Sequence, residues 1–209
     1  FYINGSKGWD DYYHNLYTEV DISYKPANYI SFTLIPSYNK SYSELQYVTT
    51  LTYNNSDRYI FAGIDQKTIS ASLRINFNLS PDLTLQYWGQ PFVASGRYHD
   101  YKYILNPLAE KYNDRFHNYT TGQLTNYPDN IGIDENTDGT DDYTIDYSDF
   151  NFKAFLSNLV IRWEYSPGSS VYLVWTQSRN GVTPAGSMDY FNDLGDLFDR
   201  RLVKSNGAY

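Results

Sequence analysis

The sequence contains no cysteine among its 209 residues. A disulfide framework, a thiolate metal site and a cysteine nucleophile are therefore excluded. Basic residues are also few, because 16 Lys and Arg stand against 24 Asp and Glu, for a formal net charge of -8 at pH 7. This balance disfavours an extended phosphate-binding surface, so nucleic acid is not expected as a partner.

Long apolar runs are missing as well. No stretch approaches the roughly 18 consecutive apolar residues of a membrane helix, which excludes a helical membrane protein. Aromatic residues, in contrast, make up 19% of the chain and include 24 Tyr. Tyr joins an apolar ring to a polar hydroxyl, so this abundance is typical of surfaces where an apolar region meets water. The chain begins at Phe1 and its only Met is Met188, so we interpret it as a fragment or a processed product.

Alternation of apolar and polar residues with a period of two dominates the chain and predicts β-strands. In residues 69–79, for example, Ile69, Leu73 and Phe77 share one face and Arg74 lies on the other. Similar patterns cover residues 16–24, 30–38, 45–53, 83–93, 150–165 and 171–178, with a less decisive segment at 58–64. Turn-forming residues stand at 25–28, 39–42, 54–57, 80–82 and 166–168. The fold class is therefore all-β, with about eight antiparallel up-and-down strands.

The expected connections alternate between short turns and long loops. The longest connection spans about residues 96–149, and a second irregular stretch follows the last strand. Short turns at one end and long loops at the other are typical of an outer-membrane β-barrel. Four Tyr are expected beside the short turns, as an interfacial girdle: Tyr24, Tyr29, Tyr53 and Tyr165. The pattern favours such a barrel or part of its wall, and a soluble antiparallel sandwich is the alternative.

Charged residues inside the expected strands all fall on the polar face. They are Glu19, Asp21, Glu44, Arg74, Arg162 and Glu164. In a membrane barrel this face lines the lumen, whereas in a sandwich it meets bulk solvent. The charges therefore fit both architectures.

Four sequence runs carry a resemblance to a known family. They are residues 58–68, 90–97, 157–168 and 171–175. Together they resemble the C-terminal DUF5916 region of Bacteroidota surface proteins, which usually follows a carbohydrate-binding family 9-like domain. The resemblance covers about residues 29–198 and implies an outer-membrane β-barrel, without a settled biochemical function. The sugar-binding-like domain and a closing strand soon after Asp199 are not recognisable here, so no function housed in them is carried over.

An acidic loop at residues 134–142 provides the sharpest local signal. Its oxygen-bearing residues have the spacing by which a short loop wraps Ca²⁺, around a turn-permitting Gly139. The candidate metal ligands are Asp134, Asn136, Asp138, Thr140 and Asp142. The twelfth position is Ile145 in place of the bidentate Glu of an EF-hand. The alternative is a solvated acidic loop, because Asp, Asn and Gly also favour turns.

Residues suited to catalysis form no recognisable pattern. The three histidines, His14, His99 and His117, lie in or near expected loops, and no Ser, His and Asp spacing marks a nucleophile. The pair Asp141 and Asp142 could do acid and base work on a glycoside, but loop carboxylates are abundant. The four Trp (Trp9, Trp88, Trp163 and Trp175) could stack sugars, although two of them fit strand patterns better. No catalytic or cofactor-binding residue is assigned, and a non-enzymatic role is favoured.

The apolar residues change phase within the expected strand at 150–165. They hold even positions from Phe150 to Leu156 and odd positions from Leu159 to Tyr165. A one-residue slip moves every side chain to the other face. The sequence therefore predicts a β-bulge or a strand start near Ser157 and Asn158.

We expect residues 1–209 to form a single β-barrel region with a long Asp-rich loop at about 96–149. The favoured function is a component of a surface complex in the bacterial outer membrane that binds or transports glycans or other nutrients, with its long loops extracellular. Its expected partners are the lipid bilayer, glycans and other outer-membrane proteins. The alternatives are a soluble all-β, calcium-dependent binding module, with Ca²⁺ as the candidate cofactor, and a surface-associated glycan hydrolase.

Overall fold

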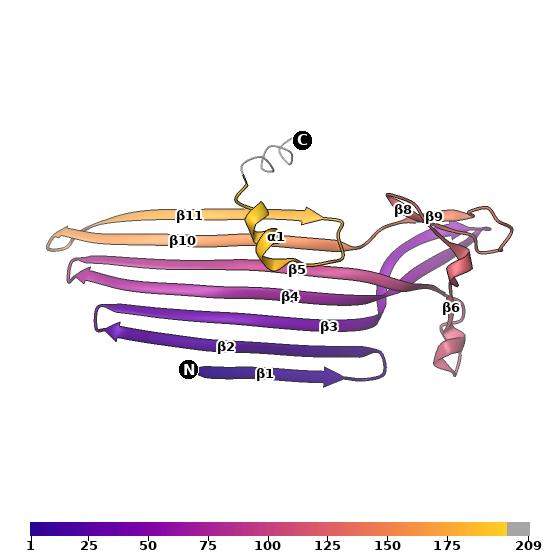
Figure 1. The fold of residues 1–209 in the computed structure, drawn as a ribbon, viewed down its shortest axis with the longest axis horizontal. Helices are drawn as coiled ribbons and strands as arrows, with labels where there is room; N and C mark the ends of the chain where they lie inside the picture. Colours follow the sequence, from indigo (N-terminus) through magenta and orange to yellow (C-terminus); the bar gives the residue numbers. More distant parts are fainter. Residues whose placement is uncertain (200–209) are drawn as a thin grey trace.

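A computed structural model describes residues 1–199 and has an all-β architecture (Figure 1). Its main sheet is antiparallel, with long strands in the order β1-β2-β3-β4-β5-β10-β11. These strands are β1 (Tyr2–Trp9), β2 (Tyr13–Ala27), β3 (Ile30–Tyr53), β4 (Ser56–Ser80), β5 (Leu83–Ile104), β10 (Phe150–Ser166) and β11 (Ser169–Thr183). Sequence neighbours pair throughout, except that β10 follows β5 after a long connection. The predicted all-β class and antiparallel order are confirmed.

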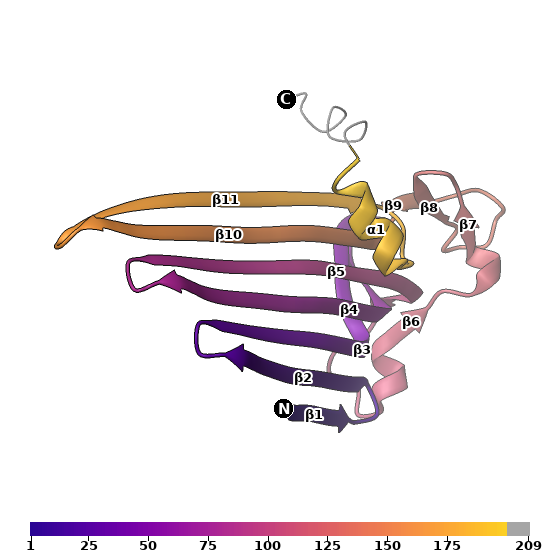
Figure 2. The same cartoon turned by 60° about the vertical axis from the view of Figure 1, so that its left-hand side comes forward.

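The long connection between β5 and β10 contains its own secondary structure. Strand β6 (Phe116–Asn118) pairs with the end of β5, and a separate antiparallel sheet is formed by β7 (Leu124–Asn126), β8 (Asn130–Ile133) and β9 (Tyr143–Asp146). Two short 3-10 helices, η1 (Tyr112–Arg115) and η2 (Thr121–Gln123), link these pieces. Helix α1 (Tyr190–Asp196) follows β11 and lies over β5 and β10 (Figure 2).

Two expected pairs of strands are each one long strand. The turn predicted at residues 39–42 is wrong, because this segment pairs with β2 on one side and with β4 on the other. Its residues are polar although they continue β3, and they do not form a turn. The turn predicted at 54–57 is confirmed at Asn54 and Asn55, whose φ angles of 49° and 57° suit the left-handed region that Asn tolerates. Strand β1 was not predicted, since its residues do not alternate apolar and polar.

Three short turns lie at one end of the sheet, between β2 and β3, β4 and β5, and β10 and β11 (Figure 2). Each turn is displaced along the strand direction relative to the one before it, so the sheet is staggered. The β3–β4 hairpin and the connection 105–149 lie at the other end. Tyr24, Tyr29 and Tyr165 are beside the short turns as predicted, whereas Tyr53 lies at the opposite end.

The two faces of the main sheet differ in polarity near the short turns. We call them the Leu73 face and the Arg74 face. Cross-strand pairing places apolar residues side by side on the Leu73 face: Tyr24, Phe32, Ile75, Tyr87, Leu159 and Trp175 form one row. Glu19, Arg74 and Arg162 lie on the opposite face. This half of the sheet therefore has one apolar face and one charged face.

Farther from the short turns, the two faces exchange polarity. The Leu73 face carries Lys40, Lys67 and Lys153 there, and the rings of Phe92 and Phe152 meet on the Arg74 face with centroids 5.9 Å apart. The predicted bulge near Ser157 is therefore wrong, because β10 pairs without a shift from 152 to 163 with both β5 and β11. The strand keeps its alternation while its surroundings change, and that change alone moves the apolar residues from even to odd positions.

The main sheet has two free edges within residues 1–199. Strand β1 pairs only with β2, and β11 pairs only with β10. In this part of the chain the sheet is therefore open and does not close into a barrel. No helix in residues 1–199 is long and apolar enough to cross a membrane.

Candidate functional site

The β3–β4 hairpin and the small sheet β7–β9 pack together at the end away from the short turns. We call this unit, made of residues 48–62 and 98–147, the head. Its core contains Ile60, Ala62, Tyr101, Tyr103, Tyr119, Ile131, Ile133 and Ile145, all of them buried. Residues 105–149 are therefore not a simple loop, because they share an apolar core with the hairpin.

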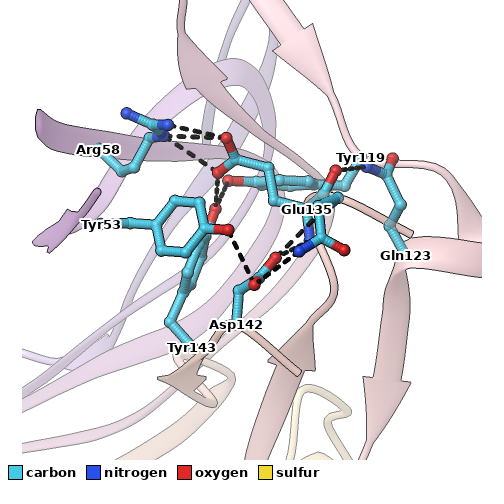
Figure 3. A network of polar contacts seen from close by, with 8 residues as sticks. Tyr53, Arg58, Tyr119, Gln123, Glu135, Asp142 and Tyr143 are labelled. Atoms are coloured by element: carbon cyan, nitrogen blue, oxygen red, sulfur yellow. Dashed lines mark hydrogen bonds and ion pairs between the residues drawn. The ribbon is translucent and has the colours of Figure 1, made fainter. Parts of the chain in front are cut away.

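A buried ion pair joins the hairpin to the small sheet. The guanidinium of Arg58 donates to both carboxylate oxygens of Glu135, with an Nη2–Oε1 distance of 2.8 Å and an Nε–Oε2 distance of 3.0 Å (Figure 3). The exposed fractions of the two side chains are only 17% and 13%. Arg58 also lies 5.5 Å from the ring centroid of Tyr53 and 5.0 Å from that of Tyr103. Bidentate geometry and aromatic neighbours suit a guanidinium, so Lys could not replace Arg58 without losing contacts.

A chain of hydroxyls extends from the same carboxylate. Tyr143 donates to Glu135 over 2.5 Å, and the hydroxyls of Tyr119 and Tyr143 are 2.7 Å apart (Figure 3). Gln123 donates its side-chain amide to the Glu135 carbonyl at 3.0 Å. These contacts hold β7, β8 and β9 around one buried carboxylate.

Burial and hydrogen bonding act in opposite directions on Glu135. Burial alone would raise the pKa of this carboxyl group, but the hydrogen bonds from Arg58 and Tyr143 and the charge of Arg58 outweigh it, and the net pKa is lowered. The pKa of Tyr143 is raised, mainly because the hydroxyl is buried and secondly because it donates a hydrogen bond to Glu135. Glu135 is therefore a carboxylate and Tyr143 a neutral donor at neutral pH, which is the protonation state that the network requires.

The structure places the five predicted metal ligands in one loop between β8 and β9. The side-chain oxygens of the three Asp and of Asn136 accept hydrogen bonds from the chain itself, whereas Thr140 acts as a donor to Asp138. Asp134 accepts from the backbone N–H groups of Asp138 and Gly139 at 3.1 and 2.8 Å, and Asp138 accepts from the N–H of Thr140 at 3.0 Å. Asp142 accepts from Tyr53 at 2.8 Å and from the Glu135 N–H at 2.8 Å. Asn136 joins the same network as a donor to Asp142.

These contacts show that the acidic loop is a turn held by its own hydrogen bonds and by the bond from Tyr53 of the β3–β4 hairpin. Among residues 1–199, no group of three or more His, Asp or Glu side chains is arranged to hold a metal ion. Ca²⁺ binding by Asp134, Asn136, Asp138, Thr140 and Asp142 stays a prediction.

That prediction has a direct test in limited proteolysis. If Ca²⁺ binds the ordered loop, cleavage near the exposed Thr140 should be slower with excess Ca²⁺ than with chelator, because a ligand of the folded form alone stabilises it by mass action. Asp138→Ala should abolish the difference. Equal cleavage rates of the unaltered chain in the two conditions would leave the hydrogen-bonded turn as the whole explanation of the sequence.

The other candidate residues lie apart from one another. Asp141 accepts from Tyr127 at 2.6 Å whereas Asp142 accepts from Tyr53, so the two carboxylates point to different partners. His99 contacts Asp65 and Asp100, and His117 packs on Tyr103.

His14 and the four Trp occupy the main sheet rather than the head. His14 stacks on Tyr42, and Trp88 donates to Ser72 on the Arg74 face. Trp9, Trp163 and Trp175 are about half exposed or more, at 69%, 53% and 49%, on the Leu73 face. Trp163 and Trp175 therefore lie within strands, as their sequence patterns predicted.

The sequence did not predict the ion pair of Arg58 and Glu135. The two residues are separated by 77 positions, and Glu135 has six other acidic residues near it in sequence. The only available signal was that Arg58 is the one basic residue of the otherwise largely apolar segment 58–64. The fold alone determines which carboxylate it meets.

Comparison with protein families gives one match. The model of a family described as a domain of unknown function, DUF5916, matches residues 3–206. No curated protein and no solved structure matches the chain.

Proposed function

Since the chain belongs to the DUF5916 family, a domain of unknown function, we propose a role for it from its geometry: it forms part of the wall of an outer-membrane β-barrel and carries a rigid extracellular head. The head would bind glycans or other nutrients within a surface complex. The observation that carries this proposal is the charge-free, solvent-exposed apolar half of the Leu73 face.

Exposure of this apolar face is difficult to reconcile with water on both sides of the sheet. Leu34 and Ile22 are 38% and 41% exposed although both lie inside the sheet, and Leu173 on the outer strand is 61% exposed. Soluble monomers rarely expose a contiguous apolar surface of this extent. A transmembrane wall needs such a band, about 25 Å tall, on its lipid side.

Two further features support a barrel wall. The progressive displacement of the short turns is the stagger that a sheet needs when it closes into a barrel with tilted strands (Figure 2). The charged residues Glu19, Arg74 and Arg162 share the face opposite the apolar band, where a lumen would keep them hydrated. The same features disfavour the soluble calcium-dependent module.

The head suits the role of an extracellular binding element. It packs on a hairpin that extends beyond the apolar band, and its buried core and ion pair fix its shape. Surface loops held by a rigid scaffold are the common place for ligand contacts. Glycan, nutrient and protein partners are therefore proposed for the head and not for the wall.

Flotation with lipid vesicles tests the proposal. The chain refolded from denaturant in the presence of phosphatidylcholine vesicles should float with them and should protect β2–β5 and β10–β11 from protease, while the head stays accessible. Protein refolded without lipid and mixed with vesicles afterwards controls for surface adsorption. Recovery of a monodisperse, folded chain in buffer without lipid or detergent would contradict the proposal and favour the soluble module.

A further inference from the structure

A row of three lysines crosses the Leu73 face directly beyond its apolar half. Pairing places Lys7 of β1 beside Leu16, Leu16 beside Lys40 of β3, and Lys40 beside Lys67 of β4. All three lysines are exposed. Within residues 1–199, none of these three ammonium groups forms an ion pair. The topology thus gathers positive charge from positions far apart in a chain whose net charge is -8.

The acidic side chains near the row are paired with other basic groups. Asp65, which also lines the groove beside the row, is paired with His99 at 3.2 Å, and Glu44 is paired with Lys102 at 3.0 Å. An open groove of about 690 Å³ lies beside the row, and Trp9, His14 and Tyr42 line it together with Lys7 and Lys40. Aromatic rings beside lysines are typical of the level at which a membrane meets water.

Elsewhere on the Leu73 face, a lysine of β10 is neutralised by acidic side chains. On β10, Lys153 lies 2.5 Å from a carboxylate oxygen of Asp196 and 3.7 Å from one of Asp193, both on α1. On β11, Arg179 donates to the carbonyl of Leu197. Helix α1 therefore supplies carboxylate oxygens to Lys153, whereas Lys7, Lys40 and Lys67 have no such partner within residues 1–199.

We propose that Lys7, Lys40 and Lys67 bind the phosphate groups of membrane lipids whose acyl chains lie on the adjoining apolar band. This inference rests on the proposed membrane orientation. The charge pattern matches an anionic amphiphile, because the cationic row and the charge-free apolar band are continuous on one face. Lysine is a common phosphate ligand that acts as a point charge, and basic residues beside a membrane surface attract anionic headgroups.

The binding of phosphatidylglycerol tests this inference. The chain reconstituted in phosphatidylcholine should bind spin-labelled phosphatidylglycerol in preference to spin-labelled phosphatidylcholine. Lys7→Gln, Lys40→Gln and Lys67→Gln should each lower that preference by about fivefold, the effect of one basic residue near an anionic surface. The triple variant should show no preference, and added salt should weaken the preference of the unaltered chain.

Three controls make the result specific. Lys111→Gln removes one exposed lysine from the head and should leave the preference unchanged. The triple Lys→Arg variant should retain it. Inorganic phosphate at constant ionic strength should not displace the lipid; displacement would indicate a site for free phosphate and would overturn the inference.

The outcomes separate this inference from the proposed function. If the unaltered chain floats with vesicles but the triple Lys→Gln variant keeps its preference for phosphatidylglycerol, the lysine row is not a headgroup site and the membrane wall stands. If the unaltered chain does not insert into vesicles, both proposals are wrong.

Discussion

Leu73→Arg is expected to weaken folding into lipid vesicles by about 2–4 kcal/mol, the cost of a basic residue on the lipid face near the bilayer midplane. Leu73 pairs with Leu34 on one side and Gly89 on the other, within the charge-free half of its face. An Arg there would have no carboxylate neighbour on the same face. The measurement is equilibrium unfolding by urea in the presence of vesicles.

Gln86→Arg is the matched control for this change. Gln86 is exposed on the opposite face, beside Asn76 and Val160, where Arg74 and Arg162 already lie. Its replacement should change the free energy of unfolding by well under 1 kcal/mol, as is usual for a hydrated surface position. Equal effects of the two substitutions would show that the Leu73 face does not contact lipid.

Arg58→Met should destabilise the head by roughly 3 kcal/mol, because it leaves the carboxylate of Glu135 buried without its counter-charge. Both side chains are more than four-fifths buried, so solvent cannot replace the lost contacts fully. Hydrogen exchange of the Ile131 and Ile133 amides reports this change locally. Protection of β10 and β11 should stay as it is, because both residues of the ion pair and their hydrogen-bond partners lie outside these two strands.

Two further variants define what the ion pair contributes. Arg58→Met combined with Glu135→Leu should recover part of the lost protection, because no uncompensated charge is left. Arg162→Met removes the partner of Glu164 from a pair that is 34% and 28% exposed, and it should cost less than about 1 kcal/mol. If the double variant were less stable than Arg58→Met alone, packing rather than charge would explain the effect.

Strand identity was predictable wherever one face of the sheet is apolar. Residues 69–79 and 83–93 alternate clearly because the Leu73 face is uniformly apolar there, and the turn between them is confirmed at Pro81 and Asp82. The same rule fails at residues 39–42, where Lys40 belongs to the cationic row and Asn39 and Ser41 lie on the other face. Polar residues on both faces resemble a turn in sequence although the ladder continues.

The supposed phase fault in β10 has the same origin. A pattern of apolar residues reports which face is apolar, and it reports register only if that face is the same along the whole strand. In β10 the apolar face changes between Leu156 and Leu159 while the pairing stays regular. Local sequence cannot distinguish a change of surroundings from an inserted residue.

The head could not be predicted because its contacts join distant segments. Its core unites residues from Ile60 to Ile145, and its ion pair joins a hairpin to the acidic loop. The sequence indicated the acidic loop and its turn residues correctly, but it did not show that Asp142 binds Tyr53. Such pairings depend on strand order, which periodicity does not encode.

The position of the head also has a consequence for the order of assembly. Strand β10 must find β5 across residues 105–149, and closing a long flexible loop carries an entropic cost that slows such pairing. The hairpin of β3 and β4 is local and can form early, and its tip then provides a template on which residues 105–147 fold. Asp149, which accepts a hydrogen bond from the Tyr98 N–H at 2.7 Å, brings Phe150 opposite Gly96, where the pairing of β10 begins. We therefore expect the head to form first and to help set the register of β10 as that strand joins the sheet.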